Sequence, residues 1–282
     1  MTSHYLPVFG QGSQPVEEDG VELEYLPMPE EMAIYRMPEI SSDLNVAALT
    51  QAKAVLSQLQ QALADFPTVS PSMDLINLDN TNRQFIDEML GEGEVSMIYS
   101  GQPVIRIQES VLAGVWRSQS LSSEKQIISD SLEVGIVPDA ITQLAFSTAN
   151  RCIDTQWAVL PTGVMNAPPL LAELNAKIAN YKPDDEAHII NLSLLPQTEE
   201  DLVFLDARLG QGSVTILSRG YGNCRISSTN THCVWWVQYF NSQDTLILNT
   251  LEVSALPNVA CASPEDIADS RQRLEEIMKV YL

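Results

Sequence analysis

The sequence predicts an α+β protein in which two tandem copies of a small module each form an antiparallel sheet of about four to five strands packed on helices. The main observation is a gap-free internal repeat, because residues 85–138 recur 119 positions later as residues 204–257. Eighteen of these 54 positions are identical, whereas average amino-acid usage would give roughly three matches by chance. A length of 282 residues also suits two domains. The sequence therefore predicts that one module is used twice.

The repeat sets the expected domain boundaries. Its period of about 115 residues is too long for a solenoid, whose repeats run about 20 to 50 residues and cannot fold singly. It suits small domains that each bury a core. We expect an arm over residues 1–42, a first module over 43–150, a linker over 151–169 and a second module over 170–282.

The N-terminal arm is expected to be disordered. Residues 17–31 contain seven acids, five prolines fall between residues 7 and 38, and no apolar periodicity runs through the segment. Such a composition cannot bury enough apolar surface to order the chain.

The first module is expected to begin with an amphipathic helix. Apolar residues at helical spacing run from Leu49 to Leu63, with an N-cap expected at Ser42 or Asp43 and a stop at Pro67. A short strand over Leu75–Leu78 and a helix over Asn80–Leu90 follow. β-branched and aromatic residues then predict strands. These cover residues 95–99, 104–108, 111–118 and 126–134, and a short helix follows over residues 139–149.

The second module repeats this order. We expect a strand over His188–Leu192, a helix over Glu199–Leu209, and four strands over residues 214–218, 224–228, 233–240 and 245–253. A last helix begins at Ser263-Pro264, where a capping residue, a proline and first-turn acids coincide. We expect this terminal helix to pack on the second sheet.

Two glycine turns, Gly91-Glu92-Gly93 and Gly210-Gln211-Gly212, each follow a helix and precede a strand. A glycine just past the last helical position favours a left-handed helix end. A phosphate-binding loop has the opposite order, strand to helix, so that helix amides face the anion. Nucleotide binding at these turns is therefore not expected.

Composition excludes several classes of function. The formal net charge is −22, from 37 acids against 15 bases, which disfavours nucleic-acid binding because phosphate contacts require clustered Lys and Arg. No run of eighteen apolar residues is present, so direct membrane insertion is not expected. The start has neither a basic n-region nor an apolar h-region, and we expect a cytoplasmic protein.

Residues for catalysis or metal binding form no convincing set. Cys224 and Cys233, the latter beside His232, are expected to meet across a hairpin, but two thiols alone are an incomplete zinc site. The chain has no GxSxG nucleophile turn. The repeated carboxylates Asp87/Asp206 and Glu133/Glu252 favour structural roles, because each copy keeps its own. We expect no catalytic residue, no bound metal and no cofactor.

A partner-binding surface is expected where the two copies differ. Trp116 and Trp235 are equivalent, which favours core packing, whereas Trp236 stands where the first copy has Arg117. Trp, Tyr and Arg are frequent anchors of interfaces. The candidate partner-binding residues are Tyr221, Asn223, Arg225, Trp235, Trp236 and Tyr239 in the second module, Met165 and Asn166 before it, and Glu92 in the first glycine turn.

Residues 219–253, RGYGNCRISSTNTHCVWWVQYFNSQDTLILNTLEV, followed by an acidic helix start at Ser263, resemble the HupH/HyaF family of hydrogenase expression and formation proteins. Further agreement comes from INL with FLDARLGQGSV at 190–214, INL with LGEGEV at 76–95, GVW at 114–116 and GVMNAPPLLAEL at 163–174. The resemblance covers roughly residues 43–282 and leaves out the acidic arm.

This resemblance implies an accessory protein for [NiFe]-hydrogenase maturation without catalytic residues. Its expected role is chaperone or scaffold for the iron–sulfur small-subunit precursor before assembly and export, with other maturation proteins as further partners. Two alternatives stay open. One is a metal or iron–sulfur carrier that uses Cys224 and Cys233, with His232 or Cys261. The other is an enzyme with a carboxylate site between the modules.

Overall fold

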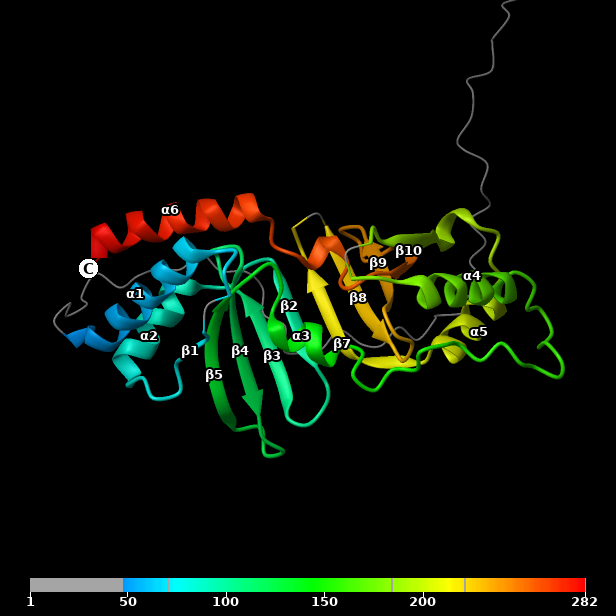
Figure 1. Cartoon of the computed structure of the whole chain (residues 1–282), viewed down its shortest axis with the longest axis horizontal. Helices are drawn as coiled ribbons and strands as arrows, with labels where there is room; N and C mark the ends of the chain where they lie inside the picture. Colours follow the sequence, from blue (N-terminus) through cyan, green and yellow to red (C-terminus); the bar gives the residue numbers. More distant parts are fainter. Residues whose placement is uncertain (1–47, 70, 184, 221, 282) are drawn as a thin grey trace, which may run out of the picture. The chain divides into compact units, whose positions relative to one another are not determined.

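The fold is built around one ten-stranded antiparallel sheet (Figure 1). The computed structural model describes residues 48–69, 71–183, 185–220 and 222–281. The strand order is β1-β5-β4-β3-β2-β7-β8-β9-β10-β6, and helices pack on this sheet, so the predicted α+β class is confirmed. The acidic arm over residues 1–42 and Tyr221 lie outside the described residues.

The elements on the two sides of the β2–β7 junction follow the same order. We call α1 to β5 the first half and α4 to β10 the second half. The first half contains α1 (Thr50–Asp65), β1 (Met73–Asp74), α2 (Asn80–Leu90), β2 (Val95–Tyr99), β3 (Val104–Glu109), β4 (Val115–Leu121) and β5 (Ile127–Val134). The second half contains α4 (Ala167–Asn180), β6 (His188–Asn191), α5 (Glu199–Leu209), β7 (Gln211–Ser218), β8 (Asn223–Thr229), β9 (Val234–Phe240) and β10 (Leu246–Val253). The connecting elements are α3 (Asp139–Leu144), the 3₁₀ turns η2 (Leu192–Leu194) and η3 (Asn258–Ala260), and α6 (Pro264–Tyr281).

Elements with local signals were predicted closely. Helices α2 and α5 have the expected bounds and end at Gly91 and Gly210, with φ angles of 50° and 66°. Strand β2 also has the expected bounds. Apart from α1, four elements differ from the prediction by more than one residue. Strand β1 lies at Met73–Asp74 rather than at residues 75–78, β4 begins at Val115 because residues 110–114 form a turn, α3 ends at Leu144 rather than at residue 149, and β7 begins at Gln211 rather than at residue 214.

The start of α1 was wrongly predicted. The helix begins at Thr50, and Leu49 at its N-cap supplies no side-chain hydrogen bond. The cap comes from α2, where Asn82 Oδ1 accepts from the Ala52 amide at 2.8 Å and Nδ2 donates to the Ala48 carbonyl at 3.1 Å. A cap supplied by another helix leaves no local sequence signal. The expected N-cap residues, 42 and 43, lie outside the described residues.

The second glycine of each turn is required by a close backbone approach. A Cβ at Gly93 would lie 2.2 Å from the Ser110 carbonyl oxygen, and one at Gly212 would lie 2.2 Å from Ser228 Oγ. These contacts are shorter than any side chain tolerates. The repeated glycines are therefore needed structurally, because no larger residue fits where the chain passes from the helix into the strand.

Two apolar cores stabilise the fold. One joins α1 and α2 to strands β2 to β4 and continues across the junction to Ile216 on β7 and Trp235 on β9. The other lies between α4, α5 and the outer strands of the second half. Trp116 and Trp235 are fully buried, and their indole nitrogens donate to the carbonyls of Gly135 at 2.8 Å and Ala255 at 3.3 Å. Their expected core position is confirmed.

Helix α6 packs on the first half, which corrects the prediction that it covers the second sheet. It lies against α1 (Figure 1), and its buried residues Ile267 and Leu274 belong to the first core. Arg273 Nη1 donates to the Val111 carbonyl at 3.3 Å. The connection after β10 leads there, with the Ala262 amide bonded to the Ile136 carbonyl at 2.9 Å. Residues of α1 and of α6 thus belong to the same apolar core, that of the first half.

Candidate functional site

The expected partner-binding residues of the second half do not share one surface. In the β8–β9 pair, Arg225 lies opposite Gln238 and Cys224 lies opposite Tyr239. Strand alternation therefore puts Asn223, Arg225 and Trp236 on one face of the sheet, and Trp235 and Tyr239 on the other. Because Trp235 is fully buried, it is a core residue and forms no part of an exposed surface.

Trp236 and Arg225 are half-buried on their face of the sheet. Trp236 Nε1 donates to Asn249 Oδ1 at 2.5 Å, and the indole packs against the second core. Burial lowers the pKa of Arg225. Glu92 lies apart from both, half-buried in the turn between α2 and β2.

Met165 and Asn166, the two candidates before α4, lie in a region rich in exposed apolar side chains. Met165 is 72% exposed. Twelve large apolar side chains are exposed among the described residues, and six of them lie on α5, on the loop before α4 or on the segment that leads into α5. We call these six the α5 surface: Val159, Leu160, Met165, Leu194, Leu195 and Val203. Such clustering marks an interaction site more often than scattered exposure does.

A groove of about 440 Å³ runs beside this surface. Its lining combines apolar groups of α5 and the preceding loop, namely Pro161, Val164, Val203, Phe204 and Ala207, with the carboxylates of Glu199 and Glu200. The two glutamates occupy the first turn of α5, where the helix dipole favours negative charge. The groove lining therefore combines apolar side chains with two carboxylates from the first turn of α5.

Asp201 fixes the start of α4 to the start of α5. It is fully buried, and its Oδ1 accepts from the backbone amides of Met165, Asn166 and Ala167 at 2.8, 2.9 and 2.9 Å. Its Oδ2 accepts from the Thr198 amide, while Thr198 Oγ1 accepts from the Asp201 amide, which forms a capping box. Burial alone would raise the pKa of Asp201, but these backbone hydrogen bonds outweigh it and lower the pKa. One carboxylate thus caps both α4 and α5.

The loop before α4 is fixed at two more points. Thr198 Oγ1 donates to the Gly163 carbonyl at 3.0 Å, and Asn166 Nδ2 donates to the Pro196 carbonyl at 2.5 Å. These bonds bring Met165 close to the segment that carries Leu194 and Leu195. The exposed apolar residues therefore belong to a rigid arrangement.

Beneath the surface, Phe204 meets Trp157 edge to face, with ring centroids 5.7 Å apart. The guanidinium carbon of Arg208 lies 5.8 Å from the centroid of the Trp157 ring and 5.1 Å from that of Phe204. This cation–aromatic contact anchors the linker to α5.

The equivalent face of α2 is polar. Gln84 and Glu88 occupy the positions of Val203 and Ala207, 119 residues earlier, and Gln84 Nε2 donates to Glu88 Oε1 at 2.8 Å. Sequence reasoning missed Val203, Leu194, Leu195 and Asp201. The signal was available, because the second copy has five more residues than the first between its INL strand and Phe204, within the stretch that holds LLPQTEED, and it exchanges two polar helix positions for apolar ones.

The thiols do not assemble into a metal site. Cys224 and Cys233 lie at opposite ends of the β8–β9 pair and in different cores, so the expected meeting across the hairpin is wrong. Burial raises the pKa of Cys224 to about 12 and that of Cys233 and Cys261 to about 11. Among the described residues no group of three His, Cys, Asp or Glu side chains is arranged to hold a metal ion.

The repeated carboxylates lie far apart. Glu133 on β5 and Glu252 on β10 are separated by six strands, which corresponds to roughly 30 Å across a sheet. Burial raises the pKa of each. They therefore do not form a paired-carboxylate site between the halves.

Comparison with known proteins decides the family. A family model described as the C-terminal conserved region of the HupH hydrogenase expression protein matches residues 49–148 and 164–281. The chain belongs to the HupH family. The resemblance drawn from residues 219–253 is thereby confirmed.

Relatives in the HupH family span nearly the whole chain. The hydrogenase expression/formation protein HoxQ of Cupriavidus necator is 46% identical and the alignment covers 99% of this chain and 98% of the relative. HupH of Rhodobacter capsulatus is 45% identical, with 98% and 97% covered. The hydrogenase-1 operon protein HyaF of Escherichia coli is 33% identical, with 98% and 96% covered. A solved HupH structure from Thiobacillus denitrificans is 32% identical, covers 40% of this chain and 95% of its own, and has a TM-score of 0.38.

No helix among the described residues is both long enough and apolar enough to cross a membrane.

Proposed function

We propose that this protein is a non-catalytic accessory factor in [NiFe]-hydrogenase maturation that holds the iron–sulfur small-subunit precursor in the cytoplasm before its assembly and export. Membership of the HupH family supports the hydrogenase role, since its relatives are named expression/formation proteins. The observation that carries the binding role is the α5 surface, an exposed apolar cluster on a rigid support. Other maturation proteins are further partners of the same assembly.

The chemistry of the α5 surface fits a transient chaperone. A precursor that lacks its clusters exposes apolar surface, and six apolar side chains beside a groove can cover part of it. The pre-formed loop reduces the conformational entropy lost on binding. Glu199 and Glu200 in the lining of the groove favour a client segment that carries a positive charge next to its apolar residues.

We infer further that the two halves arose by duplication of one module. The identities at a spacing of 119 residues and the shared order of elements support this. Under duplication, residues needed by the fold persist in both halves, whereas a client site belongs to one. The α5 surface meets that condition because the α2 face is polar.

The decisive experiment exchanges the two helix faces. The double variant Val203→Gln, Ala207→Glu gives α5 the residues that α2 carries, which a surface helix accepts without loss of fold. We expect at least a ten-fold weaker interaction with the small-subunit precursor in a purified binding assay, because two apolar contacts are replaced by solvated groups.

The matched control is Ile247→Thr, which removes an exposed apolar residue from β10, outside the α5 surface. It should leave precursor binding unchanged, and circular dichroism should show equal folding for both variants. Equal precursor binding by wild type and the α5 double variant would contradict the proposal. A stoichiometric metal in protein purified without a tag would instead favour a carrier role.

A further inference from the structure

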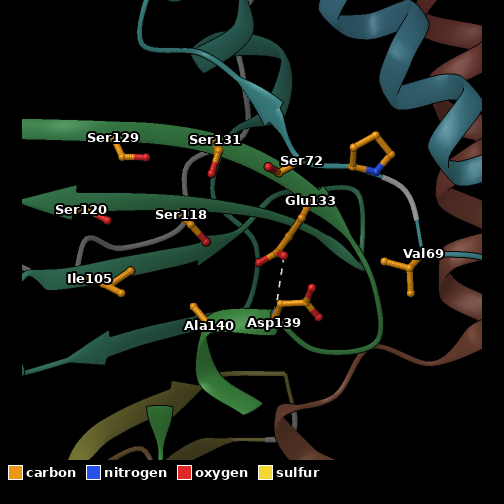
Figure 2. Close-up of a pocket in the computed structure, with 11 residues that line it drawn as sticks. Val69, Ser72, Ile105, Ser118, Ser120, Ser129, Ser131, Glu133, Asp139 and Ala140 are labelled. Carbon is orange, nitrogen blue, oxygen red and sulfur yellow. Dashed lines mark hydrogen bonds between the residues drawn. The ribbon is translucent and has the colours of Figure 1, made fainter. Parts of the chain in front are cut away.

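A second hollow lies on the face of the sheet opposite α2, in the first half (Figure 2). Its volume is about 460 Å³. Its floor is formed by serines of β4 and β5, and its wall by the end of β5, the start of α3 and the segment before β1. The lining residues are Val69, Pro71, Ser72, Ile105, Ser118, Ser120, Ser129, Ser131, Glu133, Asp139 and Ala140. We call it the serine pocket.

The serine pocket has an uncompensated acidic wall. Among the described residues, Glu133 and Asp139 are the ionisable groups of its lining, and no described Lys, Arg or His lines it. Glu133 Oε2 accepts from the Asp139 amide at 3.4 Å, and burial raises the pKa of Glu133, with the nearby Asp139 charge adding to the rise. The side chain of Glu133 points toward the start of α3 in Figure 2. A half-buried carboxylate without a cation is held at a free-energy cost that a cationic guest would remove.

One hydroxyl in the pocket also lacks a partner. Ser118 Oγ is buried and makes no hydrogen bond of normal geometry, although it lies near enough to Glu133 to oppose the rise in the pKa of that carboxyl. Buried hydroxyls are normally satisfied. Together with the hydroxyls of Ser120, Ser129 and Ser131, this oxygen can accept hydrogen bonds from a donor that enters the pocket.

The second half fills the equivalent space. Val237 and Tyr239 stand in the positions of Ser118 and Ser120, and Leu248 and Thr250 in those of Ser129 and Ser131. Val237 is fully buried and Tyr239 packs against the same core. The acid is kept as Glu252, whose Oε1 accepts from Thr250 Oγ1 at 3.2 Å. An open pocket is therefore not a requirement of the fold.

The neighbouring sheet edge can take an extended chain. Strand β1 pairs with Leu132 and Ser131 of β5, and the next amide, that of Leu75, donates to the Asp130 carbonyl at 2.8 Å. No described strand pairs with the outer edge of residues 127–129, whose side chains are exposed. Such an edge accepts a further strand through main-chain hydrogen bonds. Ser129 lies both on this edge and in the pocket, so a strand added here would place a side chain over the serines.

We propose that the serine pocket binds a Lys or Arg side chain of an extended partner polypeptide that pairs with the edge of β5 at residues 127–129. The lining offers hydroxyl and carboxylate acceptors to an ammonium or guanidinium group, and the volume admits a long side chain. A bare divalent ion fits less well, since no three metal-ligating side chains converge there among the described residues. This site does not depend on the α5 surface or on the identity of its client.

The test uses the full chain and an array of octapeptides. Each peptide has random flanking positions and a central Lys, Arg, norleucine or citrulline. We expect the wild-type protein to retain Lys and Arg peptides at least ten-fold more than norleucine or citrulline peptides. Glu133→Gln should abolish this preference, and the graft Ser118→Val, Ser120→Tyr, which installs the residues of the second half, should abolish retention.

The matched control is Glu252→Gln, which changes the equivalent acid where the pocket is filled. It should keep the full preference, and thermal unfolding should show that all variants fold. Equal retention of norleucine and Lys peptides, or an unchanged preference in Glu133→Gln, would overturn the proposal. So would an equal loss in Glu252→Gln, because that result would report net charge alone.

Discussion

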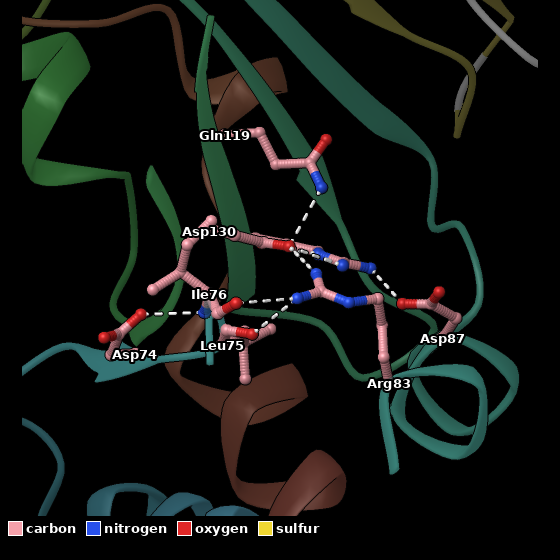
Figure 3. A network of polar contacts seen from close by, with 8 residues as sticks. Asp74, Leu75, Ile76, Arg83, Asp87, Gln119 and Asp130 are labelled. Atoms are coloured by element: carbon pink, nitrogen blue, oxygen red, sulfur yellow. Dashed lines mark hydrogen bonds and ion pairs between the residues drawn. The ribbon is translucent and has the colours of Figure 1, made fainter. Parts of the chain in front are cut away.

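Single buried polar residues fix the local geometry of this protein. Asp130 is fully buried and accepts from Arg83 at 3.0 Å, from Arg117 at 2.9 and 2.8 Å and from Gln119 at 3.1 Å (Figure 3). Burial would raise its pKa, but the hydrogen bonds and charges of Arg117, with Gln119 and Arg83, outweigh this and lower the pKa. In the second half Asn249 takes this place and accepts from Trp236. The same fold position is thus satisfied by ions in one half and by neutral groups in the other.

Replacing Asp130 by Asn should destabilise the protein by about 2–4 kcal/mol, because two partly buried arginines lose their shared counter-ion. Urea unfolding at neutral pH measures this. Since the folded-state pKa lies below the unfolded one, the contribution of Asp130 is present above about pH 4 and is lost as the pH falls further. Asp65→Asn, at an exposed acid of α1, is the control, and a loss below about 1 kcal/mol for Asp130→Asn would contradict the interpretation.

Glu109 has the opposite pH dependence. It is 7% exposed, and burial, with the nearby charges of Glu94 and Asp266, raises its pKa from 4.5 to about 7 despite a hydrogen bond from the Gly114 amide. The folded state then binds more protons than the unfolded state between pH 4.5 and about 7. Its stability therefore falls as the pH rises through that window.

Glu109→Gln keeps the acceptor for Gly114 and removes the charge. We expect the variant to exceed wild-type stability by about 1–3 kcal/mol at pH 8 and to match it near pH 4.5. Urea titrations at the two pH values provide the measurement. A variant that is less stable than wild type at pH 8 would show that the carboxylate form is stabilising.

At the scale of elements, the sequence predicts those whose ends are fixed locally. Helices α2 and α5 carry their own caps, Asp79 and Thr198, and their own terminal glycines. The start of α1 depends on Asn82 and that of α4 on Asp201, which belong to the following helices. These two capping residues are 119 positions apart, so each half uses one helix to cap the other. This capping between helices has no local sequence signal in either half and is recognised from the contacts of Asn82 and Asp201.

The α5 surface was predicted in part for the same reason. Met165 and Asn166 lie in GVMNAPPLLAEL, one of the segments that carry the family resemblance, whereas Val203 lies in a helix whose own sequence has no unusual pattern. Trp235 was expected in the core, as the repeat of Trp116, and was also named as a partner-binding candidate; its complete burial confirms the first prediction and rules out the second. Contacts between the loop and α5 could not be read from residues 35 positions apart.

Asp201→Ala should loosen α4 and the loop before it. Four backbone amides, those of Thr198 and of the three residues from Met165 to Ala167, lose their acceptor, so we expect a destabilisation of about 2–4 kcal/mol. Hydrogen exchange should be faster at the amides of Met165 and Asn166, and binding to the small-subunit precursor should weaken. Asp206→Ala, on the exposed side of the same helix, is the control. Unchanged exchange at Met165 would show that another contact holds the loop.

At the scale of the whole molecule, the halves are joined in two ways. The sheet is continuous through β2 and β7, where Met97 lies opposite Ile216, and α6 returns the end of the chain to the first half. The sequence repeat predicts the elements of each half. It does not predict how the halves are joined, because the β2–β7 pairing and the packing of α6 each occur once in the chain and have no repeated counterpart. The domain limits at residues 150 and 170 stay a prediction.

Truncating Ile267 or Leu274 to Ala tests the second link. Both residues are buried against the first core, so each change should cost about 2–5 kcal/mol. Native-state hydrogen exchange should show the largest loss of protection in α1, the nearest packing partner. Loss of protection centred on α5 instead would contradict the assignment of α6 to the first half.

The return of α6 has a consequence for synthesis. Translation delivers α1 before the second half and α6 after it, so a nascent chain on the ribosome displays an incomplete first core until α6 leaves the exit tunnel. The second half, which holds the α5 surface, has all the residues of its own core earlier. A prematurely terminated polypeptide would therefore expose the apolar face of α1, a feature that quality-control chaperones recognise.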